Sequence, residues 1–172
     1  HIEYLEVISE KKQEYFEIIK ESNDRMLKLV SDMLDVSRIE EGKWISRKQG
    51  VALEEIIDKI VKEFSLFAQG NNIKIKASIE KDLPKVLVDP QKISQAISNL
   101  LDNAIRYTKK GGEVEIKARR ENKKVRCEVK DSGVGIPKKD QKYIFQKFFR
   151  CRNVLKYQTK GTGLGLFIVK GV

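Results

Sequence analysis

Apolar residues recur at helical spacing over the first quarter of the chain. From about Glu14 the spacings of 3, 4 and 7 predict an amphipathic helix of roughly 30 residues that ends at Gly42. Residues 4–8 suggest the end of an earlier helix, and residues 9–13 a polar interruption between the two. The apolar stripe consists of Phe16, Ile19, Met26, Leu27, Val30, Met33, Leu34 and Ile39.

This stripe needs a surface to cover it. Only a short stub precedes the helix, so the N-terminal segment cannot bury the stripe by itself. We expect it to pack against the same helix of a second chain in a homodimeric bundle. Packing against its own domain is the alternative.

Beyond Gly42 the pattern changes to that of a mixed domain. It predicts strands at residues 44–48, 73–79 and 86–88 and a hairpin of residues 113–118 and 125–130. Helices are expected at residues 53–67, 90–107 and 141–148 and after Gly163. Asp89 is suited to cap the second of these helices, with Pro90 at its first position. Helices and strands alternate without a repeated parallel crossover, which favours an α+β fold, a two-layer α/β sandwich.

Composition narrows the class of protein. A chain of 172 residues with 40% apolar content can hold one domain and an appendage. No run approaches the ~20 apolar residues of a membrane span, and the N-terminus does not resemble a secretory signal. Cys127 and Cys151 form neither a disulfide framework nor a metal site. We therefore expect a cytoplasmic segment, with membrane anchoring of the parent protein left open.

Charge is distributed unevenly along the chain. Residues 1–42 contain 11 acidic and 6 basic residues, a net charge of −5, whereas the remainder has 14 and 29, a net charge of +15. A basic domain attracts nucleotide, nucleic acid or an acidic protein surface. Nucleic acid is disfavoured, because the cations are scattered over several elements without a series of stacking aromatic residues.

Two asparagines on the helix that begins at Pro90 give the first chemical signal. Asn99, Asn103 and Arg106 lie 4 and 3 positions apart and so share one stripe. Asparagine is a poor residue for a helix interior. Amide oxygens at Asn99 and Asn103 can bind a hard cation such as Mg²⁺, and Arg106 can contact phosphate. A solvated polar face is the alternative.

Two glycine clusters give the second signal. Asp131 ends a predicted strand before Gly133 and Gly135, and its carboxylate can accept a hydrogen bond from an exocyclic amine such as that of adenine; a simple Asx turn is the alternative. The second cluster opens the last helix, where backbone N–H groups can hold phosphate. It consists of Gly161, Thr162, Gly163, Leu164 and Gly165. It matches neither a P-loop nor a dinucleotide fingerprint.

The segment between the glycine clusters is strongly cationic. Phe145, Phe148 and Phe149 can anchor it as a basic lid over polyphosphate, in which we single out Arg150. A solvated loop is the alternative. Its cations are Lys138, Lys139, Lys142, Lys147, Arg150, Arg152, Lys156 and Lys160, with Asp140 as the single acid.

Together these motifs resemble a known family. Residues 99–108, 131–136, 145–148 and 161–166 are similar, in order, to the N, G1, F and G2 boxes of sensor histidine kinases. Residues 34–40 resemble the end of that family's second dimerisation helix. The resemblance covers nearly the whole chain, and four boxes in the correct order are far more specific than one glycine motif.

The resemblance implies a GHKL-type ATP-binding fold with a mixed sheet and helices on one face. Residues 1–43 would be a partial dimerisation hairpin and residues 44–172 the catalytic domain. ATP and Mg²⁺ would be the cofactors, with Asn99 and Asn103 at the metal, Asp131 at the adenine and Tyr107 in the nucleotide pocket. The lid and the second glycine cluster would lie at the phosphates. The γ-phosphoryl group would pass to a histidine and then to an aspartate of a response-regulator receiver domain.

Two features depart from the family pattern. The family's acceptor histidine is followed by an acidic residue and a proline, whereas His1 is followed by Ile-Glu-Tyr, so the acceptor is expected before the first residue and this segment is not expected to phosphorylate itself. The family's final strand pair would lie beyond Val172.

Asn99 stands where related ATPases carry a glutamate, which suits transfer to nitrogen in preference to hydrolysis. A silent dimerisation module and an ATP hydrolase are the alternatives.

Overall fold

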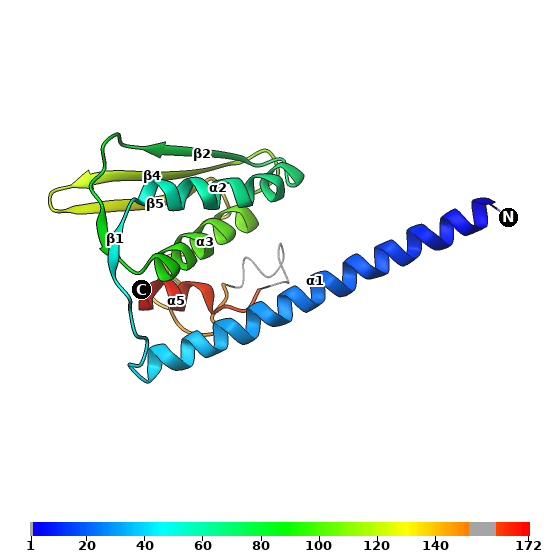
Figure 1. Ribbon diagram of the computed structural model, residues 1–172, viewed down its shortest axis with the longest axis horizontal. Helices are drawn as coiled ribbons and strands as arrows, with labels where there is room; N and C mark the ends of the chain where they lie inside the picture. The colour runs from blue at the N-terminus through cyan, green and yellow to red at the C-terminus, as the bar shows by residue number, and fades with distance from the viewer. Residues whose placement is uncertain (1, 152–160) are drawn as a thin grey trace.

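The computed structural model describes residues 2–151 and 161–172, with side chains from residue 11 onwards. One long helix leads into an α/β unit (Figure 1). In order, the elements are α1 (Ile2–Glu40), β1 (Gln49–Val51), α2 (Leu53–Gly70), β2 (Lys74–Ile79), β3 (Val86–Val88), α3 (Pro90–Tyr107), β4 (Glu113–Glu121), β5 (Lys124–Asp131) and α5 (Gly165–Gly171). Among the described residues, no helix is long and apolar enough to cross a membrane.

The main sheet has the order β2-β4-β5, with β2 parallel and β5 antiparallel to β4. Helices α2 and α3 lie together on one of its faces (Figure 1). Alternate residues of each strand point toward the helices, as the period of a strand requires. Val114 and Ile116 of β4 are fully buried against Ile57, Leu101 and Ile105 of the helices. This packing is the two-layer α+β sandwich expected from the sequence.

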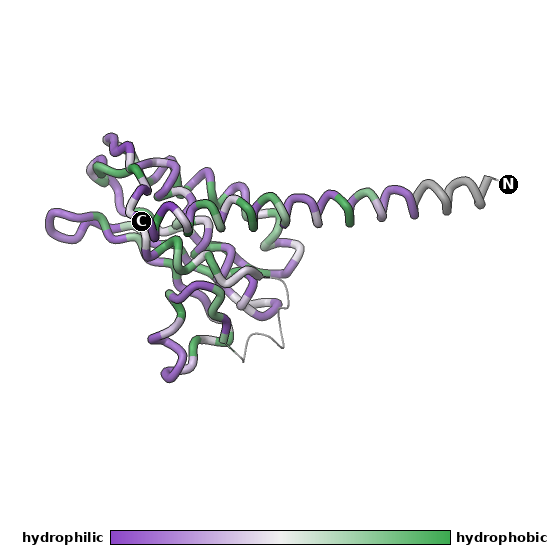
Figure 2. Tube along the Cα trace, turned by 90° about the horizontal axis from the view of Figure 1, so that it is seen from below, coloured by the Kyte–Doolittle hydropathy of each residue, from purple (hydrophilic) through white to green (hydrophobic). Residues whose placement is uncertain are grey.

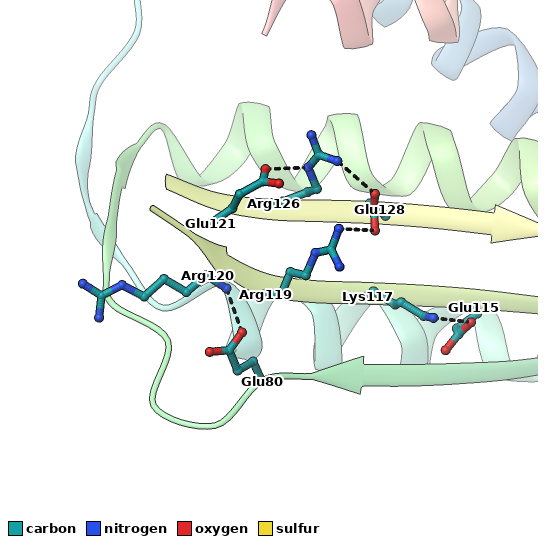
Figure 3. Close-up of polar contacts among 8 residues, drawn as sticks. All are labelled: Glu80, Glu115, Lys117, Arg119, Arg120, Glu121, Arg126 and Glu128. Atoms are coloured by element: carbon teal, nitrogen blue, oxygen red, sulfur yellow. Dashed lines mark hydrogen bonds and ion pairs between the residues drawn. The ribbon is translucent and has the colours of Figure 1, made fainter. Parts of the chain in front are cut away.

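The opposite face of the sheet is charged. Lys117 pairs with Glu115 at 3.1 Å, and Arg126 bridges to both Glu121 and Glu128 at 2.8 and 3.4 Å (Figure 3). These residues alternate with the core positions, so the pattern of hydrophobic and polar residues sets which face receives the helices. Exposed pairs of this kind contribute little to stability and mainly keep the face soluble.

A second, smaller core joins α1 to the end of the chain. Val36 of α1 is buried with Leu164 and Ile168, which precede and form α5. Among the described side chains, those of α1 that take part lie in its C-terminal half, and the coloured part of the helix that precedes them projects away from the domain (Figure 2). The domain of the same chain therefore covers one side of α1. The apolar stripe on another side stays exposed and is available to a second chain.

The stripe is exposed along most of its length. Phe16, Ile19 and Met26 are between 63 and 72% exposed, and Leu27 and Leu34 between 53 and 61%. A large apolar surface of this kind on a helix marks an interaction site.

Three sequence predictions are wrong in detail. Residues 9–13 do not interrupt the first helix, because glutamate, lysine and glutamine are good helix formers even without an apolar face. Residues 44–48 form no strand, since their backbone groups bond to side chains at the start of α3: the Trp44 carbonyl accepts from Lys92 at 2.9 Å and Arg47 N–H donates to Asp89 at 2.8 Å. The short strand lies at β1, which pairs with β3 in a separate two-stranded sheet.

Residues 141–148 are the third correction. They form successive turns in place of a helix, with Tyr143 N–H bonded to the Asp140 carbonyl and Gln146 N–H to the Tyr143 carbonyl, each at 2.8 Å. The run ends at Phe148, whose φ of 61° is incompatible with a right-handed helix. The remaining predicted strands and helices are confirmed, including the Asp89 cap and Pro90 start of α3.

The core makes a direct prediction about stability. Replacing the fully buried Leu101 with alanine should lower the free energy of unfolding by about 2–5 kcal/mol, because it removes packed methyl groups and leaves a cavity. Leu66→Ala, at a side chain 79% exposed on α2, should change it by less than about 0.5 kcal/mol. Urea denaturation measures both, and equal losses would contradict this description of the core.

Candidate functional site

Helix α3 carries the two asparagines, and its start is held firmly. Asp89 Oδ1 accepts hydrogen bonds from the backbone N–H groups of Gln91 and Lys92, and its Oδ2 accepts one from Arg47 N–H at 2.8 Å. The Arg47 bond and the two capping bonds lower the pKa of the Asp89 carboxyl group, because they stabilise its charged form. The helix is thereby fixed at the end opposite the site.

Asn99 is buried between α3, α1 and the start of α5. Its Nδ2 donates to the Gly165 carbonyl at 3.4 Å, and its Oδ1 accepts from Lys28 Nζ at 3.5 Å. A Cβ at Gly165 would lie 3.4 Å from Asn99 Cγ, an ordinary van der Waals distance, so the contact places this backbone directly against the amide. The first asparagine and the second glycine cluster, predicted to share a site, are therefore in contact.

Asn103 lies one turn further along α3 and is half-buried. Arg106, one turn beyond, is turned toward α2. Its Nε pairs with Asp102 at 2.7 Å, and its guanidinium lies 5.3 Å from the centre of the Phe67 ring. In this conformation Arg106 is bound to protein groups, so contact with a phosphate would require its release from Asp102.

A cleft of about 400 Å³ opens where α2 and α3 end. Arg106 and Tyr107 of α3 line it with Phe67 of α2 and Val134 of the first glycine turn. Tyr107 and Val134 of the first glycine turn thus border the same cavity.

The turn after Asp131 is docked on the end of α3. Asp131 Oδ1 accepts a hydrogen bond from Gly133 N–H at 2.9 Å, and Val134 N–H donates to the Tyr107 carbonyl at 3.2 Å. A Cβ at Gly133 would come within 2.4 Å of the Tyr107 oxygen, so only glycine permits this approach. Asp131 itself remains exposed beside the α3 end.

Gly135 differs from Gly133 in its surroundings. It has a φ of +66° and no atom within 4 Å of the place where a Cβ would stand. An added Cβ would therefore meet open space, and the left-handed backbone conformation is what favours glycine at this position.

The second glycine cluster is packed against the turns that precede it. Gly163 has a φ of +72°, and a Cβ there would lie 2.8 Å from the Phe148 carbonyl carbon. Phe148 N–H in turn donates to the Gly163 carbonyl at 3.0 Å. The Leu164 side chain is fully buried in the second core, so only its backbone is available to a ligand.

The described part of the basic segment is tied to its surroundings. Arg150 Nη1 donates to the Gly161 carbonyl at 3.2 Å, and Lys147 forms an ion pair with Glu40 of α1. The remaining predicted lid cations, Arg152, Lys156 and Lys160, lie outside the described residues. Lys138, Lys139 and Lys142 are exposed.

Lys28 and Asp32 of α1 are residues that the sequence analysis missed. Lys28 Nζ lies 3.8 Å from Asp32, whose carboxylate is buried. Burial raises the pKa of Asp32, and Lys28 partly offsets this effect. The spacing of four residues indicated a local pair, but nothing in the sequence pointed to a contact with Asn99, which lies 71 positions away.

The remaining reactive groups do not form a second centre. Burial raises the pKa of the Cys127 thiol to about 11 and also raises the pKa of Cys151, so both thiols stay protonated at neutral pH. In the described part of the chain, no group of three or more histidine, cysteine, aspartate or glutamate side chains could hold a metal ion. A metal at the asparagines would therefore take most of its oxygen ligands from nucleotide and water.

Two family models match the chain. Residues 2–42 match the His Kinase A (phospho-acceptor) domain, and residues 88–172 match the histidine kinase-, DNA gyrase B- and HSP90-like ATPase family. The first match ends at residue 42 and the second begins at residue 88, so neither family model covers residues 43–87.

Similar proteins support the same assignment. Drug sensory protein A of Synechocystis sp. is 33% identical over 99% of this chain and 27% of its own length. Signal transduction histidine-protein kinase BarA of Escherichia coli K12 is 32% identical over 92% of this chain and 18% of its own length. The chain thus spans about a quarter or less of these relatives.

Solved structures share the fold. Full-length ShkA in complex with AMPPNP superposes with a TM-score of 0.77 at 29% identity, covering 92% of this chain and 33% of ShkA. The catalytic domain of histidine kinase ThkA superposes with a TM-score of 0.64 at 31% identity, covering 72% of this chain and 78% of that domain. The chain therefore belongs to the sensor histidine kinase family and joins a segment that matches the family's phospho-acceptor domain to one that matches its ATP-binding domain.

Proposed function

We propose that this segment binds MgATP around the C-terminal half of α3 and transfers the γ-phosphoryl group to a histidine, from which it passes to a response-regulator aspartate. The observation that carries the proposal is the meeting of three motifs that are distant in sequence. Asn99 contacts Gly165, and the Asp131 turn is docked on Tyr107. The complex of ShkA with AMPPNP and that of ThkA with response regulator protein TrrA support the two partners.

Asp131 is the base-reading residue in this proposal. One carboxylate oxygen, Oδ1, is used by Gly133 N–H and holds the turn. The other oxygen remains to accept a hydrogen bond from the exocyclic amine of adenine. Aspartate suits both tasks because its two oxygens are both acceptors.

Asn99 and Asn103 are the groups that would hold magnesium. Both present carbonyl oxygens, the donor type that Mg²⁺ prefers, and they sit one turn apart on α3. When bound, the metal would neutralise charge on the phosphate oxygens. Gly165 contacts Asn99, and Arg150 is bonded to Gly161 at the start of the same cluster. The backbone of residues 161–165 and the side chain of Arg150 would orient the phosphates.

The residue at position 99 bears on the choice between transfer and hydrolysis. An asparagine cannot accept a proton from water, so the site lacks the general base that hydrolysis would use there. A histidine nitrogen already carries a lone pair and needs less help of this kind. The contacts of Asn99 with Gly165 and Lys28 indicate a positioning role for its amide group.

We also propose that α1 forms a homodimer through its exposed stripe. The side of α1 that carries Val36 is covered by its own domain, whereas Val30 and Met33 are still 51 and 48% exposed. The helix is thus two-sided, and the free side requires a second helix. A partner chain of the same sequence offers a stripe of matching spacing.

One assay tests the function directly. Incubation with γ-labelled MgATP and a separate phospho-acceptor helix that carries the family's histidine should place label on that helix and little in free phosphate. Predominant release of free phosphate would indicate a hydrolase, and label in neither product would indicate a silent signalling module. Omission of the acceptor helix provides the control.

Asp131→Asn should weaken binding of an adenine nucleotide by about 10–150-fold, the equivalent of about 1.5–3 kcal/mol for a charged hydrogen bond. Asparagine replaces one of the two acceptor oxygens with an NH₂ donor, so either Gly133 N–H or the adenine amine would then face a donor. Isothermal titration calorimetry measures the affinity. Asp82→Asn makes the same charge change in an exposed loop and should leave it unchanged.

Val30→Asp should convert a dimer into a monomer, because it places a charge in the centre of the apolar stripe. Light scattering should report about twice 19.8 kDa for the unmodified chain and 19.8 kDa for the variant. Ser31→Asp introduces the same charge at the next, exposed position outside the stripe and should remain dimeric. A monomeric unmodified chain would contradict the dimer.

A further inference from the structure

We propose that docking of α1 on the ATP-binding unit and cation binding at Asn99 oppose each other, because Lys28 of docked α1 contacts the Asn99 carbonyl oxygen and competes for it. The proposal rests on the proposed function, since the competing cation is the metal that accompanies the nucleotide. In this proposal, the packing of α1 on its own domain brings Lys28 to the oxygen that would bind the metal.

The first observation is an apolar seam that fixes where α1 lies. Val36 is buried against Leu164 and Ile168, and Ile39 is packed beside them. Gly171 of α5 approaches closely enough that a Cβ there would lie 2.8 Å from Ile39 Cδ1. In Figure 1, α5 lies between α3 and α1. The seam therefore holds α1 against the helix that begins at the second glycine cluster.

Polar contacts on either side of the seam set the register of α1. Asp35 Oδ2 accepts a hydrogen bond from Gln95 Nε2 of α3 at 2.7 Å. Glu40 forms an ion pair with Lys147 of the basic segment. Lys28 lies two turns before Asp35 on the same side of the helix, so these contacts bring it to Asn99, one turn after Gln95 on α3.

Lys28 is placed to leave without disturbing the seam. Its side chain is 56% exposed, and it contacts both Asn99 Oδ1 and the Asp32 carboxylate, which is 3% exposed. No apolar residue of the seam depends on its ammonium group. Lys28 therefore bridges a buried acid on α1 and the metal-binding amide on α3 while remaining accessible to solvent.

The two cations cannot share the Asn99 oxygen at low cost. A divalent ion bound there would stand within a few ångströms of the ammonium, and like charges at such a distance repel strongly near a partly buried site. Because coupling between two sites is reciprocal, a metal at Asn99 must weaken α1 docking by the same factor that docking weakens the metal. Loading of MgATP would then help to free α1 from the domain.

Lys28→Met tests the competition. Methionine keeps most of the length of the side chain and removes its charge. We expect the Mg²⁺ concentration for half-maximal binding of a non-hydrolysable ATP analogue to fall by about five- to tenfold. Lys20→Met, two turns earlier on an exposed part of α1, should leave the midpoint unchanged. Titration of Mg²⁺ at fixed analogue concentration, followed by calorimetry, gives the midpoints.

Trp44 provides an independent readout of docking. It is the single tryptophan of the chain and packs in the seam beside Ile39 and Gly171. In the unmodified chain, the analogue with Mg²⁺ should shift its fluorescence emission to the red, and the analogue with a chelator should not. Val36→Asp should open the seam and lower the Mg²⁺ midpoint as Lys28→Met does.

The outcomes separate the two proposals. An unchanged or higher midpoint in Lys28→Met, with the analogue still bound, overturns the competition and leaves the nucleotide site intact. An emission spectrum of Trp44 that stays unchanged when the analogue binds with Mg²⁺ overturns the competition as well. Failure of every variant and of the unmodified chain to bind the analogue at any Mg²⁺ concentration removes the proposed function, and the competition with it.

Discussion

The arrangement depends on α3 being packed on several sides at once. Leu101 and Ile105 are buried against the sheet and α2, Asn99 meets the start of α5, and Gln95 meets α1. A helix of 18 residues packed in this way has little freedom to rotate or slide. The asparagine stripe therefore keeps one position, and the glycine clusters are placed relative to it.

Close approach of backbone to backbone is the second constraint. Gly133 meets the Tyr107 carbonyl and Gly163 meets the Phe148 carbonyl group at distances that no Cβ would allow. At these two positions glycine is required for the chain to pack on itself, before any phosphate is considered. Gly135 is the contrasting case, since an added Cβ there would meet no atom within 4 Å and only its φ of +66° favours glycine. The glycine clusters thus combine positions where close packing requires glycine with one where the left-handed backbone conformation favours it.

Most helices and strands of the α/β unit were predicted correctly, because the residues that define each element lie close together in the sequence. Asp89 and Pro90 mark the start of α3, and the alternating residues of β4 and β5 define the sheet face. The prediction failed at residues 44–48 and 141–148, where contacts with Lys92 and Gly163 override the local pattern. The site motifs were recognised by residue type and spacing.

The contacts of the site could not be obtained in the same way. Lys28 with Asn99, Asp35 with Gln95, and Arg106 with Phe67 all join elements that are distant in sequence. Such pairs depend on how whole helices pack against one another, so no regular spacing in the sequence indicates them. The exposed stripe on α1 was visible in the sequence, but its two-sided character became clear only when the position of Val36 was known.

The hydrogen bond between Arg150 and the Gly161 carbonyl has a consequence for how the protein can diversify. The bond holds Arg150 and Gly161, which are eleven positions apart, close together. The segment between these two residues therefore starts and ends at the same place. Closing a longer span between fixed ends costs only slightly more entropy. Insertions or deletions within that span should therefore be tolerated, and relatives could vary the reach of the basic segment while Gly163 and the asparagines stay in place.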